Sequence, residues 1–123
     1  MKIDQITPDA CPQTTGLVVV IDVLRAFTTA AFAFANGATE IMLVSSVEEA
    51  FAGRQQWPDA LLMGEVNGRH IPGFDYGNSP TDLVDVDLNG RRLIQRTSAG
   101  TQGVVRSVQA TAVFSASFVC AGA

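Results

Sequence analysis

The sequence predicts a single α/β domain over residues 1–123, a three-layer α/β/α arrangement with a mixed, largely parallel sheet. Three observations lead to this fold class. The β-branched run Val18–Ile21 is apolar enough to need cover on both faces, as strands of parallel sheets do. Strand-like and helix-like patterns alternate along the chain. Hydrophobic residues make up 47% of the sequence and charged residues 16%, which suffices for a buried core.

The first half of the chain alternates apolar runs with helical patterns. Ser46 followed by Glu49 forms a capping box, which predicts a helix start, and Pro58 ends that helix. In chain order we expect an edge strand at Met1–Thr7, a strand at Leu17–Asp22, a helix at Ala26–Asn36, a strand at Glu40–Ser45, a helix over 46–57 and a strand at Ala60–Gly64.

The second half opens with a glycine- and proline-rich loop over 66–80, which is too long for a plain connector. Within it, Ser79 followed by Pro80 predicts the start of a short helix. We then expect a strand at Arg91–Thr97, a helix at Thr101–Val108, a strand at Ala110–Ser115 and the first turn of a helix over 117–123. No strand follows that last turn, so we expect part of a larger domain. A short natural paralogue and an oligomer that completes the core, such as a homodimer, are the alternatives.

Composition excludes several classes of protein. Eight Lys and Arg against twelve Asp and Glu give a net charge of −4, which argues against binding to nucleic acid or to an anionic membrane. Cys11 and Cys120 lie far apart without metal-type spacing, so we expect free thiols. No apolar run is long enough to span a bilayer, and the first residues lack a signal pattern. We expect a cytoplasmic protein.

The first candidate site is the junction after the apolar strand, where Asp22 and Arg25 precede a helix. A strand end beside a helix N-terminus is a common place to bind phosphate or a metal. Alternatively, Asp22 only caps the helix and Arg25 is an exposed residue. A cation in a first helical turn is unfavourable unless an anion lies nearby. Arg25 is therefore expected to bind a carboxylate or an anionic ligand.

Glu65 follows the expected strand at Ala60–Gly64 and is the second candidate. The carboxyl ends of parallel strands meet at one edge of a sheet, so Glu65 and Asp22 can face each other there. Two carboxylates suit Mg²⁺, which completes its shell with water and phosphate. The alternative is that Glu65 is an ordinary surface residue.

The loop over 73–80 is the third candidate. Its glycines supply positive-φ positions and exposed amides that can bind an oxyanion. Asp75 is a candidate metal ligand or base, and Asn78 and Ser79 are candidate substrate ligands. The alternative is a surface turn. His70 is the single histidine, which gives little support to a histidine-based hydrolase or a zinc site.

The fourth candidate is the short loop over 97–101, where a strand runs into hydroxyl groups and a glycine at a helix N-terminus. Amides, hydroxyls and the helix dipole favour phosphate there. The loop lacks the lysine of a nucleotide-binding P-loop. Arg96 is a further phosphate candidate whose orientation the sequence leaves open. The expected substrate ligands are Thr97, Ser98, Gly100 and Thr101.

Taken together, these segments resemble the 2-phosphosulfolactate phosphatase family, over the N-terminal half of a typical member. The matching blocks are Val-Val-Val-Ile-Asp-Val-Leu-Arg-Ala (18–26), Ala-Asn-Gly-Ala (35–38), Gly-Glu (64–65), Gly-Phe-Asp-Tyr-Gly-Asn-Ser-Pro (73–80) and Thr-Ser-Ala-Gly-Thr (97–101). The resemblance implies a Mg²⁺-dependent phosphatase that converts 2-phosphosulfolactate, or a related small phosphomonoester, to sulfolactate and phosphate, a step of coenzyme M biosynthesis. The family's loop usually reads Thr-Asn-Gly-Thr, so Ala99 replaces an asparagine.

The resemblance and the residues together suggest a mechanism. Mg²⁺ would be held by Asp22 with Glu65 or Asp75, while Arg25 and the amides of 97–101 neutralise developing charge. Attack by water and a phosphoaspartyl intermediate on Asp22 both stay open. One alternative is a haloacid-dehalogenase-type phosphatase, but that family needs a second aspartate where Leu24 stands. The other is a non-catalytic anion-binding or assembly module.

Overall fold

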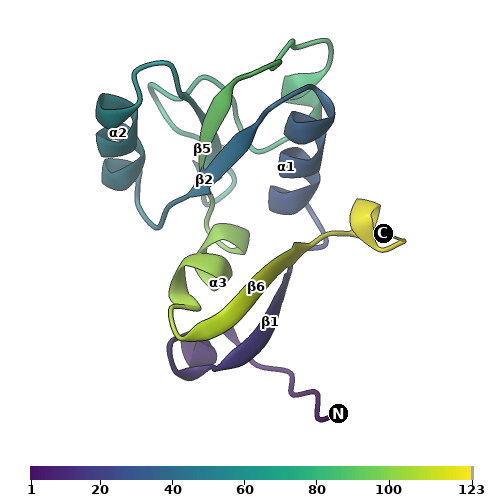
Figure 1. Cartoon of the computed structure of the whole chain (residues 1–123). Helices are drawn as coiled ribbons and strands as arrows, with labels where there is room; N and C mark the ends of the chain where they lie inside the picture. The colour runs from purple at the N-terminus through teal and green to yellow at the C-terminus, as the bar shows by residue number, and fades with distance from the viewer. Residues whose placement is uncertain (123) are drawn as a thin grey trace.

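The computed structural model describes residues 1–122 and contains six strands, three α-helices and three short 3-10 helices (Figure 1). The strands are β1 (Gly16–Ile21), β2 (Glu40–Leu43), β3 (Leu61–Val66), β4 (Arg69–His70), β5 (Arg92–Arg96) and β6 (Ala110–Ala116). The α-helices are α1 (Ala26–Ala35), α2 (Val47–Gln56) and α3 (Gly100–Arg106), and the 3-10 helices are η1 (Pro8–Gln13), η2 (Pro80–Leu83) and η3 (Phe118–Cys120).

The strands form two sheets. The larger has the order β2-β5-β3-β4, in which only the short β4 is antiparallel. The smaller is the parallel pair of β1 and β6. The α/β class and the largely parallel pairing are therefore confirmed. The division into two sheets was not predicted, because the partner of each strand is decided by residues far away in the chain.

The larger sheet has helices on both faces, with α1 on one side and α2 on the other (Figure 1). Neighbouring residues of β5 illustrate this alternation: Leu93 belongs to the core cluster under α1, and Ile94 to the cluster under α2. The second helix lies very close to the sheet, since a Cβ on Gly53 would stand 2.8 Å from a methyl carbon of Ile94. This body is the expected three-layer arrangement.

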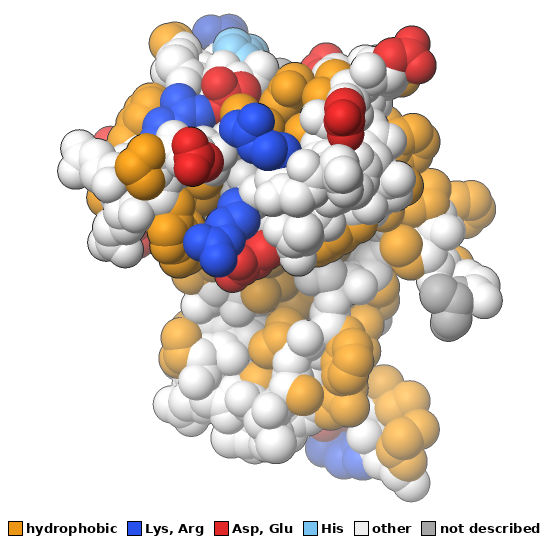
Figure 2. Space-filling model, turned by 45° about the horizontal axis from the view of Figure 1, so that its top comes forward, with side chains coloured by type: hydrophobic (Ala, Val, Ile, Leu, Met, Phe, Trp, Pro, Cys, Tyr) orange, Lys and Arg blue, Asp and Glu red, His pale blue; other side chains and the backbone are white. Residues whose placement is uncertain are grey.

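The smaller sheet is covered on one face by α3. Val18 is buried on this face, and Val20 lies so close to the helix that a Cβ on Gly103 would stand 2.7 Å from it. Charged side chains gather on the larger body, at the top of Figure 2, while the lower body shows mostly hydrophobic and uncharged surface. On the side shown in Figure 2, the two bodies therefore differ in their surface chemistry.

Most expected elements are confirmed within a residue or two. The edge strand at Met1–Thr7 is wrong: this segment has no regular structure and is exposed throughout, since no sheet edge pairs with it. The long loop contains the unpredicted strand β4, which forms a tight hairpin with β3. The expected helix over 117–123 is only the short η3, and Ala123 lies outside the described residues.

Two smaller expectations can be checked as well. Cys11 is buried, Cys120 is exposed, and both are free thiols, as predicted. Among residues 1–122, no helix has the length and apolar character needed to cross a membrane.

Candidate functional site

The candidate site lies where the carboxyl ends of the strands meet the loops that follow them. A hollow of about 660 Å³ opens there. Five residues predicted from the sequence line it, namely Arg25, Glu65, Asp75, Asn78 and Ser79, together with His70, Tyr76 and Asp82 from the long loop region. The topology thus brings together the segments after β1 and β3 and the loop over 73–80.

Asp22 follows β1 directly and holds the start of α1. Its Oδ1 accepts a hydrogen bond from the Ala26 amide at 3.3 Å, so the capping interpretation is confirmed. Its Oδ2 faces the start of α3, where a Cβ on Gly100 would stand 2.7 Å away. Burial raises the pKa of Asp22, the Ala26 amide lowers it, and the negative charge of Glu65 raises it further. The Glu65 charge has the smallest of these three effects on the Asp22 pKa.

Arg25 occupies the cap position immediately before α1 and is exposed. It lines the hollow, yet no acidic group within residues 1–122 lies within ion-pair distance of its guanidinium. A cation beside the positive end of a helix is favourable only with an anion between them. The structure thus offers a position for an anionic ligand, whose binding stays a prediction.

Glu65 is buried, with 8% of its surface exposed, so the surface alternative is wrong. Its Oε1 accepts from the Ser98 amide at 2.6 Å. Its Oε2 accepts from the Gly68 amide at 2.6 Å and from the Ser98 hydroxyl at 3.2 Å. Burial, the largest effect, raises the pKa of Glu65, but these hydrogen bonds and the Arg96 charge together lower it below its ordinary value. Glu65 therefore ties the β3–β4 turn to the loop after β5.

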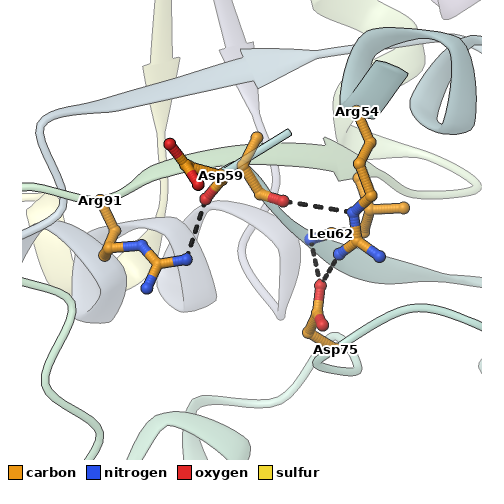
Figure 3. Close-up of polar contacts among 6 residues, drawn as sticks. Arg54, Asp59, Leu62, Asp75 and Arg91 are labelled. Carbon is orange, nitrogen blue, oxygen red and sulfur yellow. Dashed lines mark hydrogen bonds and ion pairs between the residues drawn. The ribbon is translucent and has the colours of Figure 1, made fainter. Parts of the chain in front are cut away.

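The Asp75 carboxylate is already bound by other groups of the chain. Its carboxylate forms an ion pair with Arg54 of α2 and accepts from the Leu62 amide at 2.8 Å (Figure 3). The Arg54 guanidinium is itself anchored by a bond from Nε to the Ala60 carbonyl. Asp75 lines the hollow, but its charge is already balanced by Arg54. The structure does not gather Asp75 with Asp22 and Glu65 into one carboxylate cluster.

Asn78 and Ser79 both line the hollow. The Asn78 Oδ1 atom is buried and has no hydrogen-bond partner among the described residues. The Ser79 hydroxyl shares a hydrogen bond of 2.8 Å with the Thr81 hydroxyl. Asn78 thus has an acceptor oxygen without a partner among the described residues, and its role as a substrate ligand stays a prediction.

The loop over 97–101 is held mainly by its own hydroxyls. Thr97 and Thr101 are buried, and each accepts the other's backbone amide, at 2.9 Å and 3.1 Å. Ser98 is bound to Glu65, and Ala99 caps α3 without a side-chain hydrogen bond. The hydroxyls expected to bind phosphate therefore stabilise the turn, and the amides of Ala99 and Gly100 at the start of α3 are the groups left for a ligand. Their role in binding stays a prediction.

The family model described as "2-phosphosulpholactate phosphatase" matches residues 4–123. The chain belongs to this family. Three relatives carry the name "Probable 2-phosphosulfolactate phosphatase". The one from Bacillus subtilis is 42% identical over 100 residues (81% of this chain, 44% of the relative), the one from Deinococcus radiodurans 45% over 93 residues (76% and 39%), and the one from Gloeobacter violaceus 37% over 119 residues (94% and 50%).

The family assignment confirms the resemblance drawn from the motifs, and it favours this family over the haloacid-dehalogenase alternative. The chain spans about half the length, or less, of these relatives. What the chain does by itself is therefore a matter for proposal.

Several residues around this site were not predicted from the sequence, or the orientation of their side chains was left open. Gln95 is fully buried in β5 and donates from Nε2 to the Ala26 carbonyl at 2.9 Å, joining the sheet to the start of α1. Gln102 donates to the carbonyls of Ser45 and Thr97. Arg96 donates to the Glu65 carbonyl at 2.9 Å. A glutamine within an apolar strand is a signal that could have identified Gln95.

The carboxylates can be tested for their fit to Mg²⁺. The charge of Glu65 raises the pKa of Asp22, and each carboxylate oxygen can accept more than one contact. Mg²⁺ needs only one or two protein carboxylates, so this pair fits it. Asp75 does not fit, because Arg54 neutralises it. No group of three or more His, Cys, Asp or Glu side chains arranged for a metal occurs among the described residues.

Proposed function

We propose that this chain provides the phosphate-binding part of a phosphatase site for a small phosphomonoester, with 2-phosphosulfolactate as the first candidate. The observation that carries the proposal is Arg25, which has no acidic partner among residues 1–122 and lines a hollow together with Glu65. The names of the relatives support this chemistry. A cytoplasmic location and a place in coenzyme M biosynthesis remain part of the proposal.

Arg25 and the start of α1 would bind the phosphate oxygens. A guanidinium can donate two parallel hydrogen bonds to a phosphate, and the helix dipole adds to the attraction. Asn78 would donate from its side-chain amide to a second anionic group of the substrate. These groups are positioned before substrate arrives, so they can stabilise the charge that develops during phosphoryl transfer.

Asp22 would carry the chemistry. Its raised pKa makes it a better proton acceptor than an exposed aspartate, and it lies at the strand end beside Arg25. General-base activation of water and direct attack by the carboxylate both fit this position. Asp22 and Glu65 would hold Mg²⁺, which when bound would neutralise phosphate charge.

The test uses the purified chain with Mg²⁺ and a general phosphomonoester, followed by 2-phosphosulfolactate. We expect turnover that falls about 100-fold or more in Asp22→Asn, and phosphate binding that is lost in Arg25→Ala. Arg106→Ala removes the same charge from an exposed position on α3 and should change neither. Phosphate binding that requires Arg25, without turnover, would instead identify an anion-binding module. A chain that shows no turnover and no phosphate binding would refute the proposal.

A further inference from the structure

The pair of β1 and β6 has one face that nothing in residues 1–122 covers. Side chains on a strand alternate between faces, and the register pairs Val19 with Phe114, so these two share a face. Val19 is 49% exposed and Phe114 55%. We call this surface the apolar face; it consists of Leu17, Val19, Ile21, Ala112, Phe114 and Ala116.

All six residues of the apolar face are hydrophobic, which is unusual for a surface in contact with water. Leu17 and Ile21 are 66% and 70% exposed. On the opposite face of the same strand, Val18 is 7% exposed, because α3 covers it. Parallel strands are normally buried on both faces, and contiguous apolar patches of this kind mark interaction sites. The sequence predicted cover on both faces of this strand, and within residues 1–122 only one face is covered, by α3.

The edges of this pair are also open. β1 pairs only with β6, and β6 only with β1, so each strand has one edge without a backbone partner among the described residues. A two-stranded sheet is marginally stable at best in water, and an open edge readily accepts another strand. A partner that satisfied this sheet would therefore cover the apolar face and supply a strand to one edge.

We propose that the apolar face binds a polypeptide segment equivalent to the part of the relatives that this chain does not match. Half or more of each relative lies outside the match, which is enough for several strands and helices. A second copy of this chain packed face to face would bury the same residues, but it would leave both strand edges open. It would also bring together two chains of net charge −4. A segment that carries strands satisfies the face and the edges together.

The position of the face gives the segment a functional consequence. Ile21 belongs to the apolar face, and Asp22 is the next residue. A segment seated on the face would lie beside the end of β1, immediately before Asp22. The binding itself does not depend on the proposed phosphatase activity.

The experiment co-expresses the full chain with the tagged unmatched segment of the Bacillus subtilis, Deinococcus radiodurans or Gloeobacter violaceus relative. We expect capture of the chain, and a mass of one chain plus one segment by sedimentation. Val19→Lys should weaken binding about tenfold or more. Val108→Lys, at a 75% exposed valine outside the face, should not.

Hydrogen exchange of the unsubstituted chain gives a readout that does not depend on the folding of a variant. Amides of β1 and β6 should be protected when the segment is bound, and those of β2 should change little. Failure of all three segments to bind would overturn the proposal. So would binding that Val19→Lys leaves intact, or a homodimer of the chain alone that protects the same strands.

Discussion

Replacing Glu65 by glutamine should destabilise the protein by about 2 kcal/mol, because the side chain would lose one of the acceptor oxygens that join two loops. The carboxylate accepts two amide bonds of 2.6 Å and one hydroxyl bond of 3.2 Å, and hydrogen bonds to a charged group contribute about 1.5–3 kcal/mol each. Glutamine keeps one acceptor oxygen, but its NH₂ group would face the other backbone amide donor. Alanine removes both acceptors and should cost about 4 kcal/mol.

The assay is urea unfolding of the wild-type chain and Glu65→Gln at several pH values. The pKa of Glu65 is lowered in the folded state, so its stabilisation is complete above the ordinary pKa of glutamate and is lost as pH falls through the lowered value. The difference in unfolding free energy should therefore be largest at pH 7 and shrink below about pH 4. Glu48→Gln, at an exposed position on α2, should show no such difference. Equal stability at pH 7, or a gap independent of pH, would refute the reasoning.

Two further substitutions test the backbone of the site. Gly64→Ala should destabilise the protein by more than about 3 kcal/mol, because its Cβ would stand 1.8 Å from the Arg96 carbonyl oxygen at a φ of +144°. Gly68→Ala is the matched control, with positive φ but open space around the Cβ, and should cost only about 1 kcal/mol in the same urea titration. Ala99→Asn should change stability by less than about 0.5 kcal/mol, because the Thr97 hydroxyl already accepts the Thr101 amide and the Ala99 carbonyl accepts the Gln102 amide. A melting temperature raised by several degrees in that variant would contradict this reasoning.

The elements of the fold could be predicted because they depend on local patterns. The capping box at Ser46 is confirmed, since the Ser46 hydroxyl accepts the Glu49 amide at 3.1 Å. The pairing of strands depends on distant residues, and β1 and β6 are separated by most of the chain. The same limit explains the wrong strand at Met1–Thr7, whose alternation looks strand-like although no sheet edge receives it.

The candidate site was predictable to a similar extent. Strand ends converge in any open parallel sheet, so Asp22 and Glu65 could be placed together from their positions alone. The ion-pair partner of Asp75 could not be predicted, because Arg54 lies on the helix that covers one face of the sheet, 21 residues away in sequence. Nor could the sequence reveal that the hydroxyls of Thr97 and Thr101 bind each other's backbone amides.

Two glycines determine how closely the parts of this site approach one another. Gly64 lets β3 pass the Arg96 carbonyl, which places Glu65 against the Ser98 amide. Gly100 lets the start of α3 approach the Asp22 carboxylate. A side chain at either position would separate the carboxylates from the loops that hold them. The family motifs therefore contain two kinds of residue: those that face the hollow, such as Arg25, and those whose small size allows the site to form.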